Sequence, residues 1–107
     1  MQKNGVDEIS GNEFDSIISK PLVLIDFFAE WCMPCVMMAP VIEELNEKLK
    51  NVKFAKVNVD DNSELARKFK VMSIPCLIIF KQGKEVERIT GSVPAEVIEE
   101  KLKKHLK

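Results

Sequence analysis

Apolar and polar residues follow one another along this chain in short runs that predict strands. Residues 22–28 are almost all apolar, which is typical of a central strand covered on both faces. Gln82 and Gly83 lie between two further strand-like runs, and such a pair favours a tight turn within an antiparallel hairpin. In chain order, the predicted strands are residues 6–9, 22–28, 52–59, 76–81 and 85–90.

Helices are predicted where apolar residues recur at steps of three and four. Ser10 and Glu13 form a capping box, which opens a helix that runs to about Ser19. The longest helix is expected over residues 32–50, where one apolar stripe faces the core. The stripe consists of Cys35, Met38, Ile42, Leu45 and Leu49. Pro40 lies within this helix, so we expect a kink there but no break.

Two shorter helices complete the pattern. Asn62 or Ser63 caps a helix that runs to about Phe69, and Pro94 suits the first position of the last helix. A helix between two strands implies a right-handed crossover and a parallel strand pair. The order β-α-β-α-β-α-β-β-α therefore predicts an α/β fold, with a central mixed β-sheet of four to five strands flanked by about four helices.

Length and composition place the chain among globular proteins. Its 107 residues can bury one core, so we expect residues 1–107 to form a single domain. The net charge of -1 provides no basic field for nucleic acid phosphates. Asp26 and Glu30 interrupt the longest apolar stretch, so we expect no membrane span. The first eight residues lack the apolar core of a secretory signal, and we therefore expect a cytoplasmic protein.

Two of the three cysteines form a Cys-x-x-Cys motif where the central strand ends and the longest helix begins. Residues three apart in a helical turn have Cα atoms about 5 to 6 Å apart, within the range that a disulfide bond tolerates. The positive end of the helix dipole stabilises a thiolate at Cys32. Cys35 lies on the apolar stripe, so we expect it to be buried and Cys32 to be exposed. This arrangement predicts that Cys32 attacks a disulfide and that Cys35 resolves the intermediate.

Asp26 lies within the apolar run of the central strand. Burial at this position would remove water from its carboxyl group and raise its pKa. Such a group could accept a proton from Cys35 and later return it. The alternative is a hydrogen-bonded buried acid with no catalytic part, and the strand context favours neither interpretation over the other.

Cys76 and His105 lie outside the motif. Alternation along the strand turns Cys76 away from the face that Pro75 presents, which favours a small buried core residue. The competing hypothesis is a metal-binding module that uses both motif cysteines together with Cys76 and His105. The absence of a second Cys-x-x-Cys motif and the distant helix that carries His105 argue against a metal site.

Taken together, these features resemble the thioredoxin family over essentially the whole chain. A Cys-x-x-Cys motif beside a strand-helix-strand pattern is typical of thioredoxin-like redox proteins. The matching blocks are residues 26–35 and 56–60, Ala39-Pro40, Ile74-Pro75, the Gln82-Gly83 turn and Gly91. Met33 stands where the family usually has glycine, which makes the loop a Cys-Met-Pro-Cys variant of the active site. The residues between the cysteines influence the reduction potential, which the sequence leaves open.

The resemblance implies a thioredoxin fold with a cis peptide bond between Ile74 and Pro75. It also implies an apolar surface around Cys32, where the Ile74 backbone pairs with an extended segment of a target protein. The residues assigned to this surface are Trp31, Met33, Pro34, Ile74, Pro75 and Gly91. Lys56 matches the family lysine that lies near the buried acid and tunes its pKa.

The activity that the resemblance implies is that of a thiol-disulfide oxidoreductase, here a protein disulfide reductase that needs no cofactor. Its partners would be disulfide-containing target proteins and a separate thioredoxin reductase, since the chain has no Gly-rich nucleotide fingerprint. We expect a monomer. An oxidase or isomerase on the same fold is the alternative closest in chemistry, and a measured reduction potential separates the two. A redox-inactive interaction domain is disfavoured by the intact cysteine pair.

Overall fold

The computed structural model describes residues 6–106, which form one five-stranded sheet and four helices. The strands are β1 (Asp7–Glu8), β2 (Val23–Phe28), β3 (Lys53–Asn58), β4 (Cys76–Lys81) and β5 (Lys84–Thr90). The helices are α1 (Gly11–Ile18), α2 (Met33–Lys48), α3 (Ser63–Lys68) and α4 (Ala95–Lys103). The predicted order of elements and the predicted fold class are confirmed.

The sheet is mixed and has the strand order β1-β3-β2-β4-β5. Strand β2 occupies its centre, where it pairs in parallel with β3 and antiparallel with β4. The hairpin of β4 and β5 turns at Gln82 and Gly83, whose φ angles of 52° and 89° are both positive. Both faces of β2 are covered, as its apolar run predicts.

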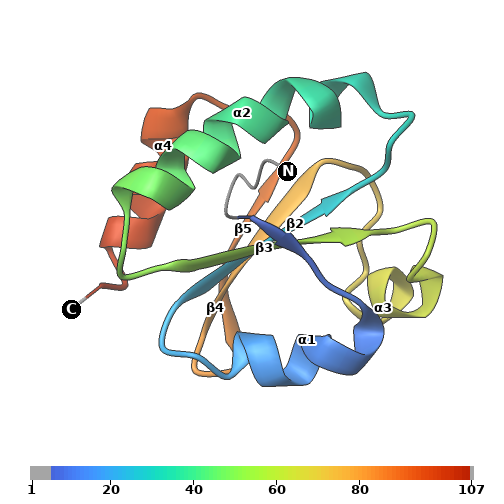
Figure 1. Ribbon diagram of the computed structural model, residues 1–107, viewed down its shortest axis with the longest axis horizontal. Coiled ribbons are helices and arrows are strands. Elements are labelled where there is room, and N and C mark those ends of the chain that lie inside the picture. Colours follow the sequence, from blue (N-terminus) through green and yellow to red (C-terminus); the bar gives the residue numbers. More distant parts are fainter. Residues whose placement is uncertain (1–5, 107) are drawn as a thin grey trace.

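Helices α2 and α4 cover one face of the sheet, and α1 and α3 cover the other (Figure 1). Successive side chains of a strand point to opposite faces, so each strand contributes to two cores. On the α2 and α4 side, the largest buried residues are Leu24, Phe54, Leu77, Ile79, Ile42 and Ile98. On the α1 and α3 side, they are Ile25, Phe27, Ile78, Phe80 and Phe14.

Local signals in the sequence place the helix ends. The backbone N–H of Ser10 donates to the Glu13 carboxylate at 2.9 Å, which closes the predicted capping box of α1. Helix α2 continues through Pro40 without a break. Its predicted start is one residue early, because Cys32 caps the helix from outside; Pro94 likewise precedes α4 as its N-cap. Within residues 6–106, no helix is both long enough and apolar enough to cross a membrane.

Candidate active site

The Cys-x-x-Cys motif lies at the carboxyl end of the central strand, where β2 passes into α2. A short turn joins the two elements, and the Cys32 N–H donates to the Ala29 carbonyl at 3.2 Å. Cys32 then caps α2 with an extended backbone, and Pro34 lies in the first turn of the helix. The motif is therefore held by two regular elements whose ends are fixed by hydrogen bonds.

Cys32 and Cys35 are joined by a disulfide bond, with 5.2 Å between their Cα atoms. The predicted pairing distance is confirmed. The Cys35 backbone N–H donates to the Cys32 sulfur at 3.2 Å, so this sulfur receives a hydrogen bond at the positive end of α2. Once the pair is reduced, the same N–H and the helix dipole stabilise negative charge on Cys32 in particular.

The predicted exposure of Cys32 is wrong for the disulfide form. Cys32 and Cys35 are each only 4% exposed. The bond draws the Cys32 sulfur back toward the first turn of α2, and Phe28, Val59 and Ile74 pack against the pair. Exposure therefore does not distinguish the two sulfurs, whereas position does, since Cys32 lines the adjacent groove and Cys35 is not among its lining residues.

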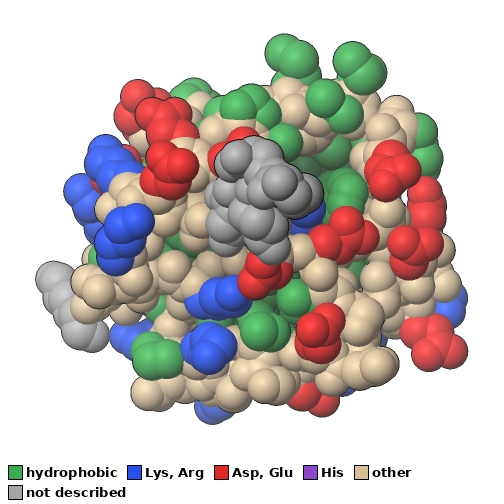
Figure 2. Space-filling view, viewed as in Figure 1, with side chains coloured by type: hydrophobic (Ala, Val, Ile, Leu, Met, Phe, Trp, Pro, Cys, Tyr) green, Lys and Arg blue, Asp and Glu red, His purple; other side chains and the backbone are tan. Residues whose placement is uncertain are grey.

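That groove has a volume of about 500 Å³ and a mostly apolar lining. Its walls are Trp31, Cys32, Met33, Pro34, Val59, Val71, Met72, Ser73 and Ile74. Trp31, Met33 and Met72 are 70%, 65% and 90% exposed, and Figure 2 shows apolar side chains gathered over the first turns of α2. Exposed large apolar residues next to a hollow mark a site that binds another molecule. We refer to this hollow as the groove.

The structure brings only part of the predicted surface into the groove. Trp31, Met33, Pro34 and Ile74 line it. Pro75 and Gly91 lie outside the lining, where the Gly91 N–H donates to the Pro75 carbonyl at 2.8 Å. The peptide bond between Ile74 and Pro75 is cis, as the resemblance implies.

Four lining residues were missed by sequence reasoning: Val59, Val71, Met72 and Ser73. Asp60 was missed as well, although its carboxylate accepts a hydrogen bond from the Trp31 indole N–H at 2.9 Å and so fixes the exposed ring. A usable signal existed, because these residues follow β3 or precede β4, and the ends of adjacent strands meet at one edge of a sheet.

Asp26 is buried in the middle of β2, with 5% of its surface exposed. Burial raises the pKa of its carboxyl group from 3.8 to about 7, although attraction by Lys56 acts in the opposite direction. Lys56 lies directly opposite Asp26 on β3, and its Nζ is 5.4 Å from the centre of the Phe28 ring. The Oδ1 atom of Asp26 is buried without a hydrogen-bond partner, which is not the satisfied acid of the alternative interpretation.

The side chain of Asp26 points to the α2 side of the sheet. Its partner across the strands, Leu77, packs in the core that α2 and α4 cover. Cys35 occupies the first position of the buried stripe of α2, one turn before Met38, which packs in that same core. The acid and the inner cysteine therefore face the same layer between sheet and helix.

Cys76 and His105 are not drawn into the site. Cys76 is buried on the α1 and α3 side of the sheet, as alternation predicts. Burial raises the pKa of its thiol, an effect that the Arg88 guanidinium partly offsets. The His105 ring instead lies 2.8 Å from a Glu87 carboxylate oxygen. Among residues 6–106 no three His, Cys, Asp or Glu side chains are placed to hold a metal ion.

Comparisons with known proteins agree with this geometry. A family model described as Thioredoxin matches residues 5–104. A thioredoxin of Chlamydia pneumoniae is 47% identical over 97 residues, which cover 91% of this chain and 95% of that protein. A thioredoxin of Bacillus subtilis is 46% identical over 94 residues, or 87% of this chain and 90% of that one. The solved structure of a mutant thioredoxin from Halobacterium salinarum superposes with a TM-score of 0.92 at 31% identity, over 100% of this chain and 96% of that chain.

Proposed function

We propose, from the premise that this chain belongs to the thioredoxin family and is a thiol-disulfide oxidoreductase, that Cys32 is its attacking sulfur and Cys35 its resolving sulfur. The observation that carries the proposal is the hydrogen bond from the Cys35 N–H to the Cys32 sulfur at 3.2 Å, at the wall of the groove. A sulfur that is both stabilised as a thiolate and accessible from the groove is the one placed to attack.

In the proposed first step, the Cys32 thiolate attacks one sulfur of a disulfide in the target protein. A bond forms between Cys32 and that sulfur, and the target disulfide breaks. The other target sulfur leaves as a thiolate, which takes up a proton. The product is a mixed disulfide between this chain and its target.

In the second step, the Cys35 thiol gives its proton to Asp26 and attacks the Cys32 sulfur. The mixed disulfide breaks, and the second target thiolate leaves and is protonated. Two electrons have then passed from the dithiol to the target, which is reduced, while the Cys32–Cys35 disulfide forms again. A carboxyl group with a pKa of about 7 is suited to accept and return a proton near neutral pH.

We assign target binding to the groove and its surroundings. Trp31, Met33, Pro34 and Ile74 offer apolar contact area, and the flexible thioether of Met33 can adapt to different targets. Pro75 and Gly91 support the wall from behind through their mutual hydrogen bond. Lys56 limits the rise of the Asp26 pKa and so tunes the proton acceptor.

Membership of the family implies disulfide-containing substrates and a thioredoxin reductase as partners. We further propose that residues 1–107 form one domain that acts as a monomer in the cytoplasm, with no cofactor beyond the disulfide and no nucleic acid or membrane partner. The family match over residues 5–104 and the net charge of -1 support this description. The Cys-Met-Pro-Cys loop is, on this proposal, the redox-active motif.

The direction of electron flow has a specific alternative, because the exposed Met33 lies between the cysteines and can shift their reduction potential. We propose that the chain acts as a reductase, with a potential more negative than that of the cytosolic glutathione pool. Equilibration with glutathione redox buffers measures this potential. A value above that of the pool would instead favour an oxidase or isomerase.

The assignment of the two sulfurs predicts opposite behaviour for two variants. Cys32→Ser should abolish reduction of insulin, since no attacking thiolate remains. Cys35→Ser should still attack but fail to resolve, so covalent adducts with the target should accumulate on a non-reducing gel. The matched control is Cys76→Ala, which should keep its turnover because Cys76 lies on the other side of the sheet. Adducts that form through Cys76, or turnover by Cys32→Ser, would contradict the assignment.

A further inference from the structure

The wall of the groove opposite the cysteines is a single segment, residues 71–74, which joins α3 to the cis Pro75 and β4. The segment begins at a sharp reversal of the chain. Lys70 has a φ of 56°, in the left-handed region, and the Val71 N–H donates back to the Ala66 carbonyl at 2.9 Å. The shape of this wall therefore depends on how the reversal at the end of α3 is held.

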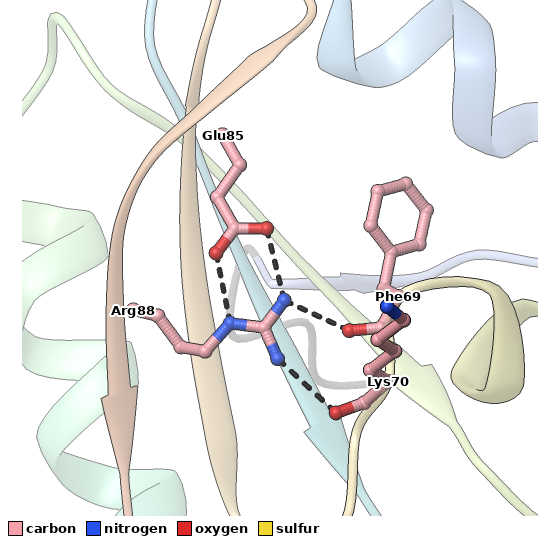
Figure 3. A network of polar contacts seen from close by, with 4 residues as sticks. All are labelled: Phe69, Lys70, Glu85 and Arg88. Atoms are coloured by element: carbon pink, nitrogen blue, oxygen red, sulfur yellow. Dashed lines mark hydrogen bonds and ion pairs between the residues drawn. The ribbon is translucent and has the colours of Figure 1, made fainter.

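Arg88 holds that reversal from outside. Its side chain extends from β5, and its guanidinium donates to the Phe69 carbonyl at 2.8 Å and to the Lys70 carbonyl at 3.3 Å (Figure 3). Both carbonyls lie just beyond the last turn of α3, where the negative end of the helix dipole attracts a cation. Val71, the first residue of the groove wall, follows Lys70 directly.

Glu85 fixes the guanidinium in turn. Its two carboxylate oxygens accept from Nε of Arg88 at 2.8 Å and from Nη2 at 2.9 Å, which is a bidentate pair (Figure 3). The guanidinium thus makes four hydrogen bonds to partners on two elements. A fork of this shape needs the planar arginine side chain, since lysine has one ammonium group and cannot span both carbonyls and the carboxylate.

We propose that Arg88 is a positioning residue for target binding, which holds the backbone at Phe69 and Lys70 so that residues 71–74 keep the shape of the groove wall. The inference rests on the proposed function of the groove. A wall that is ordered before the target arrives loses less conformational freedom on binding, so the clamp lowers the KM for protein targets. Arg88 touches neither cysteine, and the chemical step at Cys32 is independent of it.

The test compares Arg88→Met with the parent protein. Methionine keeps an unbranched apolar stem but removes every donor. We expect kcat/KM for insulin to fall about fivefold, mainly through KM, as the loss of one or two charge-assisted hydrogen bonds would suggest. Reduction of a small aromatic disulfide should stay within about twofold of the parent, because such a substrate reaches Cys32 without spanning the wall.

Two further measurements separate positioning from general stability. Hydrogen exchange of the Val71 amide should be faster in Arg88→Met, since this amide lies in the clamped reversal. Lys53→Met is the matched control, because it also removes a paired surface cation, at the start of β3 and about 20 Å of strand away from Val59 in the groove. This control should leave both substrates and the Val71 amide unchanged. Arg88→Lys, which folds more readily, should give a smaller rise in KM in the same direction.

The proposal is overturned if Val71 exchange is unchanged, if exchange is faster but the KM for insulin is not raised, or if both substrates lose activity equally. Failure of the proposed function would look different. In that case Cys32→Ser would retain activity towards both substrates, whatever the outcome at Arg88.

Discussion

Asp26 carries the one strongly perturbed acid of the site. Its pKa in the folded protein is about 7, against 3.8 for an ordinary aspartate, because the carboxyl group is buried. The folded state therefore keeps its proton over a pH range in which the unfolded state has released it. Below about pH 4 both states are protonated and burial has no electrostatic cost. As the pH rises from about 4 to 7 the folded state loses stability relative to the unfolded state, and above about pH 7 the loss is constant.

We predict that Asp26→Asn changes the pH dependence of stability. The shift of the Asp26 pKa corresponds to a ceiling of about 4 kcal/mol in the free energy of unfolding. The stability of Asp26→Asn relative to the parent should therefore increase by up to that amount between about pH 4 and pH 8. Urea denaturation of the oxidised proteins at several pH values measures this difference. A difference that does not vary with pH would show that the Asp26 pKa is not raised.

Cys76 is a contrasting case, since it is a thiol without access. It is 2% exposed, and burial raises its pKa, so little reactive thiolate forms at its sulfur. We predict that iodoacetamide labels Cys32 of the reduced native protein rapidly and Cys76 very slowly. Mass spectrometry of peptides at successive times measures both rates. In urea all three cysteines should react at similar rates, whereas rapid native labelling of Cys76 would contradict its burial.

At the scale of elements, periodicity and end signals were sufficient to predict the fold. The apolar run of β2 predicted a strand with two covered faces, and the stripe of α2 from Cys35 to Leu45 predicted which side would be buried. The errors occurred at helix ends. Cys32 and Pro94 were placed inside helices that begin one residue later, because a capping residue is identified by its backbone conformation, which the sequence does not specify directly.

The turn between β4 and β5 depends on glycine at one position. Gly83 has a φ of 89°, and no atom lies within 4 Å of the place a Cβ would occupy, so an added side chain would meet backbone strain but no steric clash. We predict that Gly83→Ala destabilises the protein by about 1 kcal/mol. Gly11→Ala is the control, because Gly11 begins α1 and its Cβ would meet only Asn62 at 3.7 Å. It should be neutral or slightly stabilising. Equal midpoints in urea for the two variants would contradict the prediction.

At the scale of the whole molecule, the groove is assembled from parts of the chain that are far apart in sequence. The cysteine loop, the residue after β3 and residues 71–74 meet only when the sheet is complete. The reactive pair could be predicted because both cysteines lie within one helical turn. The wall residues, the Arg88 clamp and the burial of Cys32 could not, because they arise from packing between elements, which local patterns do not record.

The position of the β4–β5 turn has a practical consequence for handling the protein. Strand β4 begins next to the groove at Cys76, and six residues later, about 20 Å along the strand, it ends beside Gln82. Gln82 is exposed, while its own N–H and that of Gly83 are tied to carbonyls at the end of α1. A tether attached to the Gln82 side chain would therefore hold the molecule by a firm point. On a sensor chip or a resin, every copy would then present its groove to the solution.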